Sequence, residues 1–221
     1  IAMNQTGLNN IFKMVSESYH GDYYYRKPRM DFELLRKYHE GVIALSACLG
    51  GVYAGCYWQK REEGSEAVLK CMREMTEEML FTFGDRWYPE VQWNAVPEQH
   101  ELNQYIIQIA KEYDLKIVST GDSHYPTPDA WKDRELYKRL GWLGRGKPEW
   151  LDMNLPTSVQ EMEYELYPKN GQQMWESYKQ YSEECGQEYD DDLIRQSIEE
   201  SYHIAMERCE DFIPDTTIRL P

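Results

Sequence analysis

Three short apolar runs separated by helical patterns constrain the fold of this chain more than any other feature. The runs are GVIALSAC (Gly41 to Cys48), WYPEVQW (Trp87 to Trp93) and KIVSTGD (Lys116 to Asp122). In the first and third runs the first half is nearly all β-branched, small or apolar, which is typical of parallel strands covered on both faces. The middle run is a weaker strand because Pro89 interrupts it.

Amphipathic helical patterns fill the gaps, over residues 8–19, 65–83 and 96–114. The first places four apolar residues on one face: Leu8, Ile11, Phe12 and Val15. The last begins with Pro97, a residue suited to the first helical position, and carries Leu102, Ile106 and Ile109. Strands that alternate with helices predict an α/β fold of βα units, arranged as a parallel sheet or barrel.

The composition changes after Asp129. We expect a helix there, then a Gly-rich loop up to Trp150, and acidic helices as far as about Arg208. The segment YDDDL (Tyr189 to Leu193) predicts the start of the last helix, since Asp in a first turn suits the helix dipole. We therefore divide the chain into residues 1–150 and a helical flank, residues 151–221, that contributes no metal ligand.

The net charge of −15 repels phosphates, which argues against this chain providing the main nucleic-acid-binding surface. One basic and aromatic patch stands out, Tyr23 to Tyr25 followed by Arg26, Lys27 and Arg29. It can stack on single-stranded nucleic acid, or it can be a packed loop.

Five cysteines form an odd set without a C-x-x-C spacing, which favours a reduced, cytoplasmic protein. No apolar run approaches the length of a membrane span, and no signal peptide opens the chain. The abrupt start at Ile1, without an initiator Met, indicates a fragment.

The strand ends carry the residues best suited to chemistry. Asp122 and His124 follow the third run, and on a strand their side chains would share a face. Asp and His are ordinary ligands of zinc or manganese and also an acid–base pair, whereas the alternative is a helix cap with an exposed histidine. Cys48 has the same placement after the first run, as a metal ligand or a small buried residue.

Other polar residues are less specific. Glu90 and Gln92 alternate on the middle run and would face one interior, either as a polar network or as the wet face of an edge strand. The remaining histidines lie in helical, polar stretches and are predicted to be surface residues: His20, His39, His100 and His203.

Four separated blocks resemble the PHP (polymerase and histidinol phosphatase) domain of bacterial C-family replicative DNA polymerases, the polymerase III alpha subunits. In chain order they are NQTGLNNIFKMVSESY, YYRKPRMDFELLRKYHEGVIALSACLGG, PEQHELNQYIIQIAKEYDLKIVSTGDSHY and IAMERCEDFIP. The resemblance covers nearly the whole chain and is weakest over residues 143–189.

The resemblance implies a distorted (β/α)7 barrel, of which residues 1–150 would be the C-terminal part. It further implies up to three zinc or manganese ions at the strand ends, with Cys48, Asp122 and His124 as ligands and the remaining ligands upstream of Ile1. The family often has a His-Gly pair where this chain has Asn94-Ala95, so these two are not counted as ligands.

The parent protein implied is a DNA-directed DNA polymerase, a nucleotidyltransferase that uses magnesium at a palm domain beyond Pro221. Three functions follow: a metal-dependent 3′–5′ exonuclease, a metal-free scaffold that binds a separate exonuclease, and a free-standing phosphatase, which ranks last. The implied partners are the rest of the polymerase chain, DNA and nucleotides through other domains, a sliding clamp and a proofreading exonuclease subunit, in the cytoplasm and without a membrane.

Overall fold

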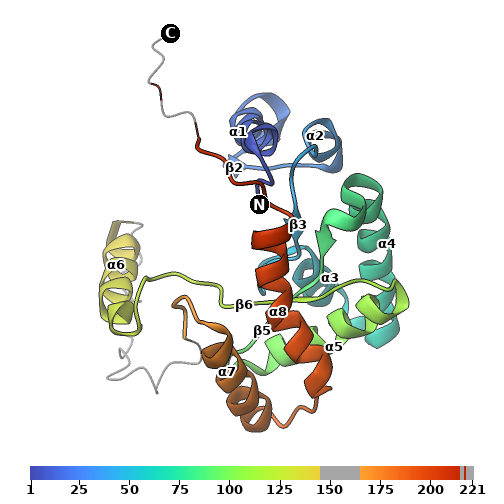
Figure 1. Cartoon of the computed structure of the whole chain (residues 1–221), viewed down its shortest axis with the longest axis vertical. Helices are drawn as coiled ribbons and strands as arrows, with labels where there is room; N and C mark the ends of the chain where they lie inside the picture. Colours follow the sequence, from blue (N-terminus) through green and yellow to red (C-terminus); the bar gives the residue numbers. More distant parts are fainter. Residues whose placement is uncertain (145–164, 215–216, 218–221) are drawn as a thin grey trace.

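The computed structural model describes residues 1–144, 165–214 and 217. The helices are α1 (Gln5–Ser18), α2 (Phe32–Lys37), α3 (Val52–Lys60), α4 (Ser65–Phe83), α5 (Pro97–Glu112), α6 (Trp131–Gly144), α7 (Gly171–Glu184) and α8 (Asp191–Glu207). The strands are β1 (Tyr24–Tyr25), β2 (Lys27–Pro28), β3 (Ala44–Leu45), β4 (Trp87–Tyr88), β5 (Glu90–Gln92) and β6 (Val118–Thr120). Figure 1 shows the central strands with α8 beside β6 and α3, α4 and α5 grouped together. Within the described residues, no helix is long and apolar enough to cross a lipid bilayer.

The three predicted strand runs all form strands, and these pair in parallel. β3 pairs with β4, with Ala44 opposite Trp87, and β5 pairs with β6, with Glu90 opposite Val118. The middle run is split at Pro89, which has no N–H to donate to a ladder. The predicted parallel arrangement is therefore confirmed. Among the described residues the pairs stay two-stranded and form no closed barrel.

Helices α4 and α5 form where the periodicity predicts them. α4 has its predicted bounds, and α5 starts with Pro97 in its first turn. The apolar face of α5 is buried at Leu102, Ile106 and Ile109, within the cluster that forms the main core. Burying such a side chain stabilises the fold by about 1.5–3 kcal/mol, so this face fixes α5 against the strands.

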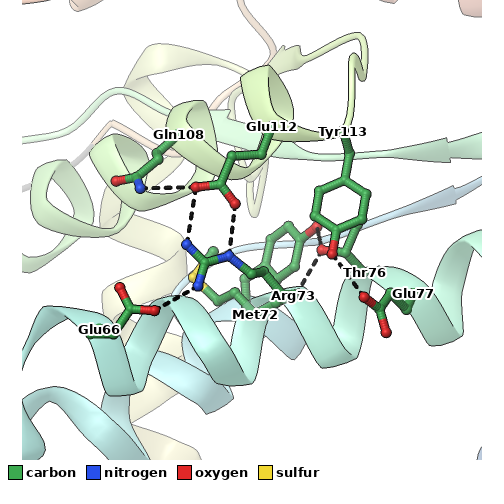
Figure 2. Close-up of polar contacts among 9 residues, drawn as sticks. Glu66, Met72, Arg73, Thr76, Glu77, Gln108, Glu112 and Tyr113 are labelled. Carbon is green, nitrogen blue, oxygen red and sulfur yellow. Dashed lines mark hydrogen bonds and ion pairs between the residues drawn. The ribbon is translucent and has the colours of Figure 1, made fainter.

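Polar contacts join the outer edges of α4 and α5 (Figure 2). Arg73 donates from Nε to Glu112 Oε2 at 2.8 Å and from Nη1 to Glu66 Oε1 at 2.8 Å. The hydrogen bond from Arg73 lowers the pKa of the Glu112 carboxyl below its ordinary value. Tyr113 donates to Glu77 Oε1 at 3.0 Å further along the helices. Exposed pairs of this kind contribute about 0–1 kcal/mol each, so they align the helices while the core holds them.

Helix α1 forms as predicted, but it buries a different face. Its buried residues are Gly7, Asn10, Met14 and Ser18. Phe12 and Val15, from the predicted apolar face, are 59% and 44% exposed. The reason is a close approach, because a Cβ on Gly7 would lie 1.8 Å from the carbonyl oxygen of Gly41. Only glycine permits this contact, which leaves Phe12 and Val15 outside while Ile11 packs partly buried against the core.

The last helix, α8, packs against strands β4 and β6. The Asp190 side chain caps α8, which confirms the predicted start of this helix. Ile204 is buried against residues of β4 and β6, and Ser197 Oγ lies 2.7 Å from Ser119 Oγ on β6. Residues 145–164 lie outside the described part, and with them the predicted Gly-rich loop and the predicted boundary between residues 150 and 151.

The cysteines include one bonded pair, contrary to the expectation of a fully reduced set. Cys56 on α3 and Cys71 on α4 form a disulfide, with their Cα atoms 5.6 Å apart. The sequence spacing hid this pair because it arises from two helices that pack side by side. Cys48, Cys185 and Cys209 are free thiols.

His100 is a core residue, and its prediction as a surface residue is wrong. Its ring is fully buried, with Nε2 2.8 Å from the Asn94 carbonyl oxygen and Nδ1 2.9 Å from the Tyr189 hydroxyl. Burial lowers the pKa of His100, and the hydrogen bond with Asn94 acts in the opposite direction. Tyr189 lies 89 residues further along the chain, so no local pattern could show this pairing.

Candidate strand-end site

The carboxyl ends of β3, β5 and β6 meet at one edge of the paired strands. Ser46 follows β3, and its backbone N–H donates to the Tyr88 carbonyl at 3.1 Å. The Ser46 hydroxyl accepts a hydrogen bond from the backbone N–H of Glu90 at 2.8 Å. Since β5 then pairs with β6, residues that follow all three strands are brought into one neighbourhood.

A buried carboxylate joins the three strand ends. Glu90 is only 7% exposed. Its Oε2 accepts from the backbone N–H of Ala47 at 3.0 Å, after β3. Its Oε1 accepts from Gln92 Nε2 at 3.0 Å on β5 and from the Thr120 hydroxyl on β6. We call Ser46, Ala47, Glu90, Gln92 and Thr120 the Glu90 network.

This network confirms one of the two open predictions for the middle run. Glu90 and Gln92 face a common interior and bond to each other, so the run is not the wet face of an edge strand. Thr120 also belongs to the network and was not predicted. Its position two residues before Asp122, on the same face of the predicted strand, could have indicated that its side chain points to this site.

Backbone geometry after β3 fixes the position of Cys48. Ala47 has a positive φ of 62°, and the N–H that it directs at Glu90 holds this turn. A Cβ on Gly51 would lie 2.0 Å from the Ser46 carbonyl oxygen, so only glycine permits this close backbone approach. The Cys48 thiol is free and half-buried.

Asp122 and His124 lie beside each other, but not for the reason that the sequence indicated. β6 ends at Thr120, and Asp122 has a positive φ of 45°, so strand geometry does not extend to His124. Instead His124 Nδ1 lies 2.6 Å from the Asp122 carbonyl oxygen and 4.0 Å from Asp122 Oδ1. The backbone N–H of His124 donates to the Leu166 carbonyl at 2.7 Å, which anchors this turn.

This geometry determines which ring nitrogen of His124 is available. A carbonyl oxygen can only accept, so Nδ1 carries the proton and Nε2 of the neutral ring keeps its lone pair. The His124 side chain is 45% exposed and the Asp122 side chain 35%. The turn therefore presents a carboxylate and a free imidazole nitrogen to solvent.

The three predicted ligands are not grouped into one site among the described residues, and since the predicted set includes further ligands outside this chain, it stays a prediction. In the part of the chain that the structure describes, no three His, Cys, Asp or Glu side chains are grouped closely enough to hold an ion. Cys48 thus does not join Asp122 and His124 in such a group. A catalytic zinc site uses three protein ligands, so the pair alone does not fit the metal centre that the resemblance implies.

The sequence of this chain is similar to a known domain family and to named bacterial proteins. Residues 1–94 match the PHP domain model. The DNA polymerase III subunit alpha of Aquifex aeolicus is 43% identical over 129 residues, which are 58% of this chain and 10% of that protein. The Thermus aquaticus subunit is 38% identical over 57% of this chain and 10% of its own length. The Borreliella burgdorferi subunit is 26% identical over 96% of this chain and 16% of its own length.

The chain spans about a tenth of the length of the first two of these relatives. The similarity to the Borreliella burgdorferi subunit runs along nearly the whole chain and therefore includes both strand pairs. Residues 1–94 thus match the PHP domain family, and the chain is similar to one segment of the bacterial DNA polymerase III alpha subunits.

Proposed function

We propose that this chain is the PHP region of a DNA polymerase III alpha subunit. The parent protein would be a DNA-directed DNA polymerase whose magnesium-dependent nucleotidyl transfer takes place in another domain. The similarity over 96% of the chain to a protein of that name supports this assignment. The parallel strand pairs support a partial, distorted (β/α)7 barrel, with residues 1–150 in the barrel and residues 151–221 as its helical flank.

Within the polymerase, the function that the geometry supports best is a structural brace. The observation that carries this proposal is the Glu90 network, in which one buried carboxylate accepts hydrogen bonds from three strand ends. A carboxylate whose oxygens are already occupied has little capacity left for a metal ion or a substrate proton. The strand-end edge is thus built to keep its shape, as a support for neighbouring domains requires.

A second candidate function, phosphoester hydrolysis, rests on the Asp122–His124 pair. This pair is exposed, and His124 Nε2 is free to bind a zinc or manganese ion. Because the described residues supply two ligands, the proposal needs a third from a segment outside them. If loaded, the metal would activate water for a 3′–5′ exonuclease reaction, in which His124 and Asp122 would serve as ligands.

The two functions are separated by one variant of the full-length protein. We would measure bound zinc and manganese by mass spectrometry, release of 3′ nucleotides from a labelled single strand, and primer extension. For a brace, His124→Ala matches the control His20→Ala, another exposed histidine, in all three measurements. If His124→Ala alone loses both bound metal and nucleotide release while primer extension persists, the brace is replaced by the exonuclease.

The partners proposed are the rest of the polymerase chain, a sliding clamp and a proofreading exonuclease subunit, with DNA and nucleotides bound by other domains. The exposed apolar face of α1, with Phe12, Val15 and Tyr19, supports contact with further protein. We place the protein in the cytoplasm, which its similarity to bacterial replication proteins supports, although a disulfide such as Cys56–Cys71 is rare in that compartment.

A further inference from the structure

The β1–β2 hairpin presents aromatic and basic side chains to solvent. Tyr24 pairs with Pro28 and Tyr25 with Lys27, so Arg26 alone forms the turn, with a φ of 61°. Tyr24 is 48% exposed and Tyr25 is 61% exposed. The packed loop that the sequence left open as an alternative is therefore not what forms here.

The rings and guanidinium groups of the hairpin are arranged as neighbouring flat surfaces. The guanidinium carbons of Arg26 and Arg29 lie 5.3 Å and 5.4 Å from the centre of the Tyr25 ring. The Tyr24 ring stacks on Tyr19, the residue that follows α1, with centres 6.1 Å apart and planes 22° apart. The cation–π contacts hold the arginines in place next to exposed ring faces.

The cations of the hairpin have no acidic partner. Among the described residues, no carboxylate forms an ion pair with Arg26, Lys27 or Arg29, although Arg36, Lys37 and Arg73 all have one. Two nearby acids are occupied elsewhere, since Asp31 caps α2 and Glu17 pairs with Lys37, while Asp22 and Glu33 lie close by and form no ion pair with these cations among the described residues. On a chain with a net charge of −15, three unpaired cations on one hairpin are complementary to an anionic partner.

We propose that the β1–β2 hairpin, with Arg29 and Tyr19, is a contact site for single-stranded nucleic acid. An unpaired base offers a face that can stack on Tyr25 or Tyr24, and its phosphates suit Arg26, Lys27 and Arg29. A duplex keeps its base faces stacked inside, so it could use the cations but not the rings. The site goes beyond the proposed function, which places DNA contacts in other domains, and it is compatible with a local grip on an otherwise acidic chain.

Fluorescence anisotropy tests this site in the full-length protein, with a labelled oligothymidylate of about 16 nucleotides. Tyr25→Leu keeps the apolar bulk but removes the stacking face, so the Kd should rise about 5- to 100-fold with an unchanged salt dependence. Arg26→Gln combined with Arg29→Gln should weaken binding and reduce the slope of log K against log salt by about 1.4. The matched control, Lys70→Gln with Lys111→Gln, removes two exposed lysines elsewhere and should leave both quantities close to wild type.

Hairpin variants that bind the oligothymidylate as tightly as the control variant would overturn the proposal. So would hairpin variants whose Kd for a duplex of the same length rises as much as their Kd for the single strand. A third contrary result is a Kd that depends only on the net charge of the variant and not on Tyr25. Thermal melting of each variant shows whether it is folded, which the exposure of these side chains leads us to expect. The assay needs no polymerase activity. Hairpin-dependent binding without primer extension would therefore remove the polymerase assignment and leave this site intact.

Discussion

The two polar clusters at the strand ends, the Glu90 network and the Asp122–His124 turn, differ in where their hydrogen bonds go. Glu90 is buried and accepts from three strand ends. Asp122 and His124 are partly exposed, and their side-chain contacts involve mainly each other. A polar residue at a strand end is therefore not by itself evidence of a catalytic or metal-binding role. A cluster whose polar atoms are hydrogen-bonded to one another stabilises the fold, whereas a cluster with an imidazole nitrogen that has no such bond can bind a ligand.

The largest effect is expected when the occupied cluster is broken at its centre. Glu90→Ala removes the acceptor of three hydrogen bonds, from the Ala47 N–H, Gln92 Nε2 and the Thr120 hydroxyl, although Gln92 keeps a hydrogen bond to Thr120. A hydrogen bond contributes about 0.5–1.5 kcal/mol, so we expect a loss of about 3 kcal/mol in the free energy of unfolding. Urea unfolding monitored by circular dichroism measures it. An unfolding midpoint equal to wild type would show that the network is not structural.

A buried histidine extends the comparison to pH. The lowered pKa of His100 means that the folded state resists protonation, while the unfolded chain binds a proton below about pH 6.5. Stability from this group is therefore complete above that pH and falls as the pH drops towards the folded pKa. His100→Gln should cost about 2 kcal/mol at pH 7, from lost hydrogen bonds with Asn94 and Tyr189, and should flatten the decline between pH 7 and 5.

Unfolding curves at several pH values test this expectation, with His20→Ala as the exposed control. An equally steep decline in His100→Gln and in wild type would assign the acid sensitivity to other groups.

The Thr120 hydroxyl can be removed from the Glu90 network without changing the shape of the side chain. Thr120→Val replaces the hydroxyl, which donates to Glu90 Oε1 and accepts from Gln92 Nε2 at 3.2 Å, by a methyl group. We expect a loss of about 1–2 kcal/mol in the free energy of unfolding, from two lost hydrogen bonds, although Gln92 keeps its other acceptor. The control is Ser123→Ala, three residues further along on an exposed position. Equal melting temperatures for the two variants would contradict a role for Thr120.

The smallest effect on stability is expected at the exposed cluster. His124→Ala removes a side chain that is 45% exposed and bonded through Nδ1 to the Asp122 carbonyl. The change in the free energy of unfolding should stay within about 0.5 kcal/mol, as for surface substitutions in general. A large loss of stability in His124→Ala would remove the contrast between the two clusters.

Local patterns predicted α1, α4, α5, α6 and α8 and the order of strands β3 to β6, whereas α2, α3 and the β1–β2 hairpin were not predicted. The period of apolar residues defines α4 at its observed bounds, and Pro97 marks the start of α5. The parallel pairing follows from the alternation of strands and helices. These features depend on residues within one turn or one strand of each other, which a sequence pattern contains.

The errors come from contacts between segments that lie far apart in the chain. The face of α1 was misjudged because Gly7 packs on Gly41, a backbone contact that has no hydrophobic signal. His100 was misjudged because its partner Tyr189 lies in the C-terminal part. In the candidate site, the adjacency of Asp122 and His124 was predicted, although a turn rather than a strand produces it.

The break at Pro89 has a consequence for how insertions are tolerated. The first half of the middle run, β4, pairs with β3, and the second half, β5, pairs with β6. The register of one strand pair therefore does not determine the register of the other. Loops after β3 and β6 can therefore lengthen or shorten independently over evolutionary time. The two strand pairs are linked by the Glu90 side chain and by the hydrogen bond from the Glu90 backbone N–H to the Ser46 hydroxyl. Hydrogen bonds of the Glu90 network thus take the place of a continuous ladder. We expect sequence variation among relatives to spare the Glu90 network and to accumulate in the loops on either side of it.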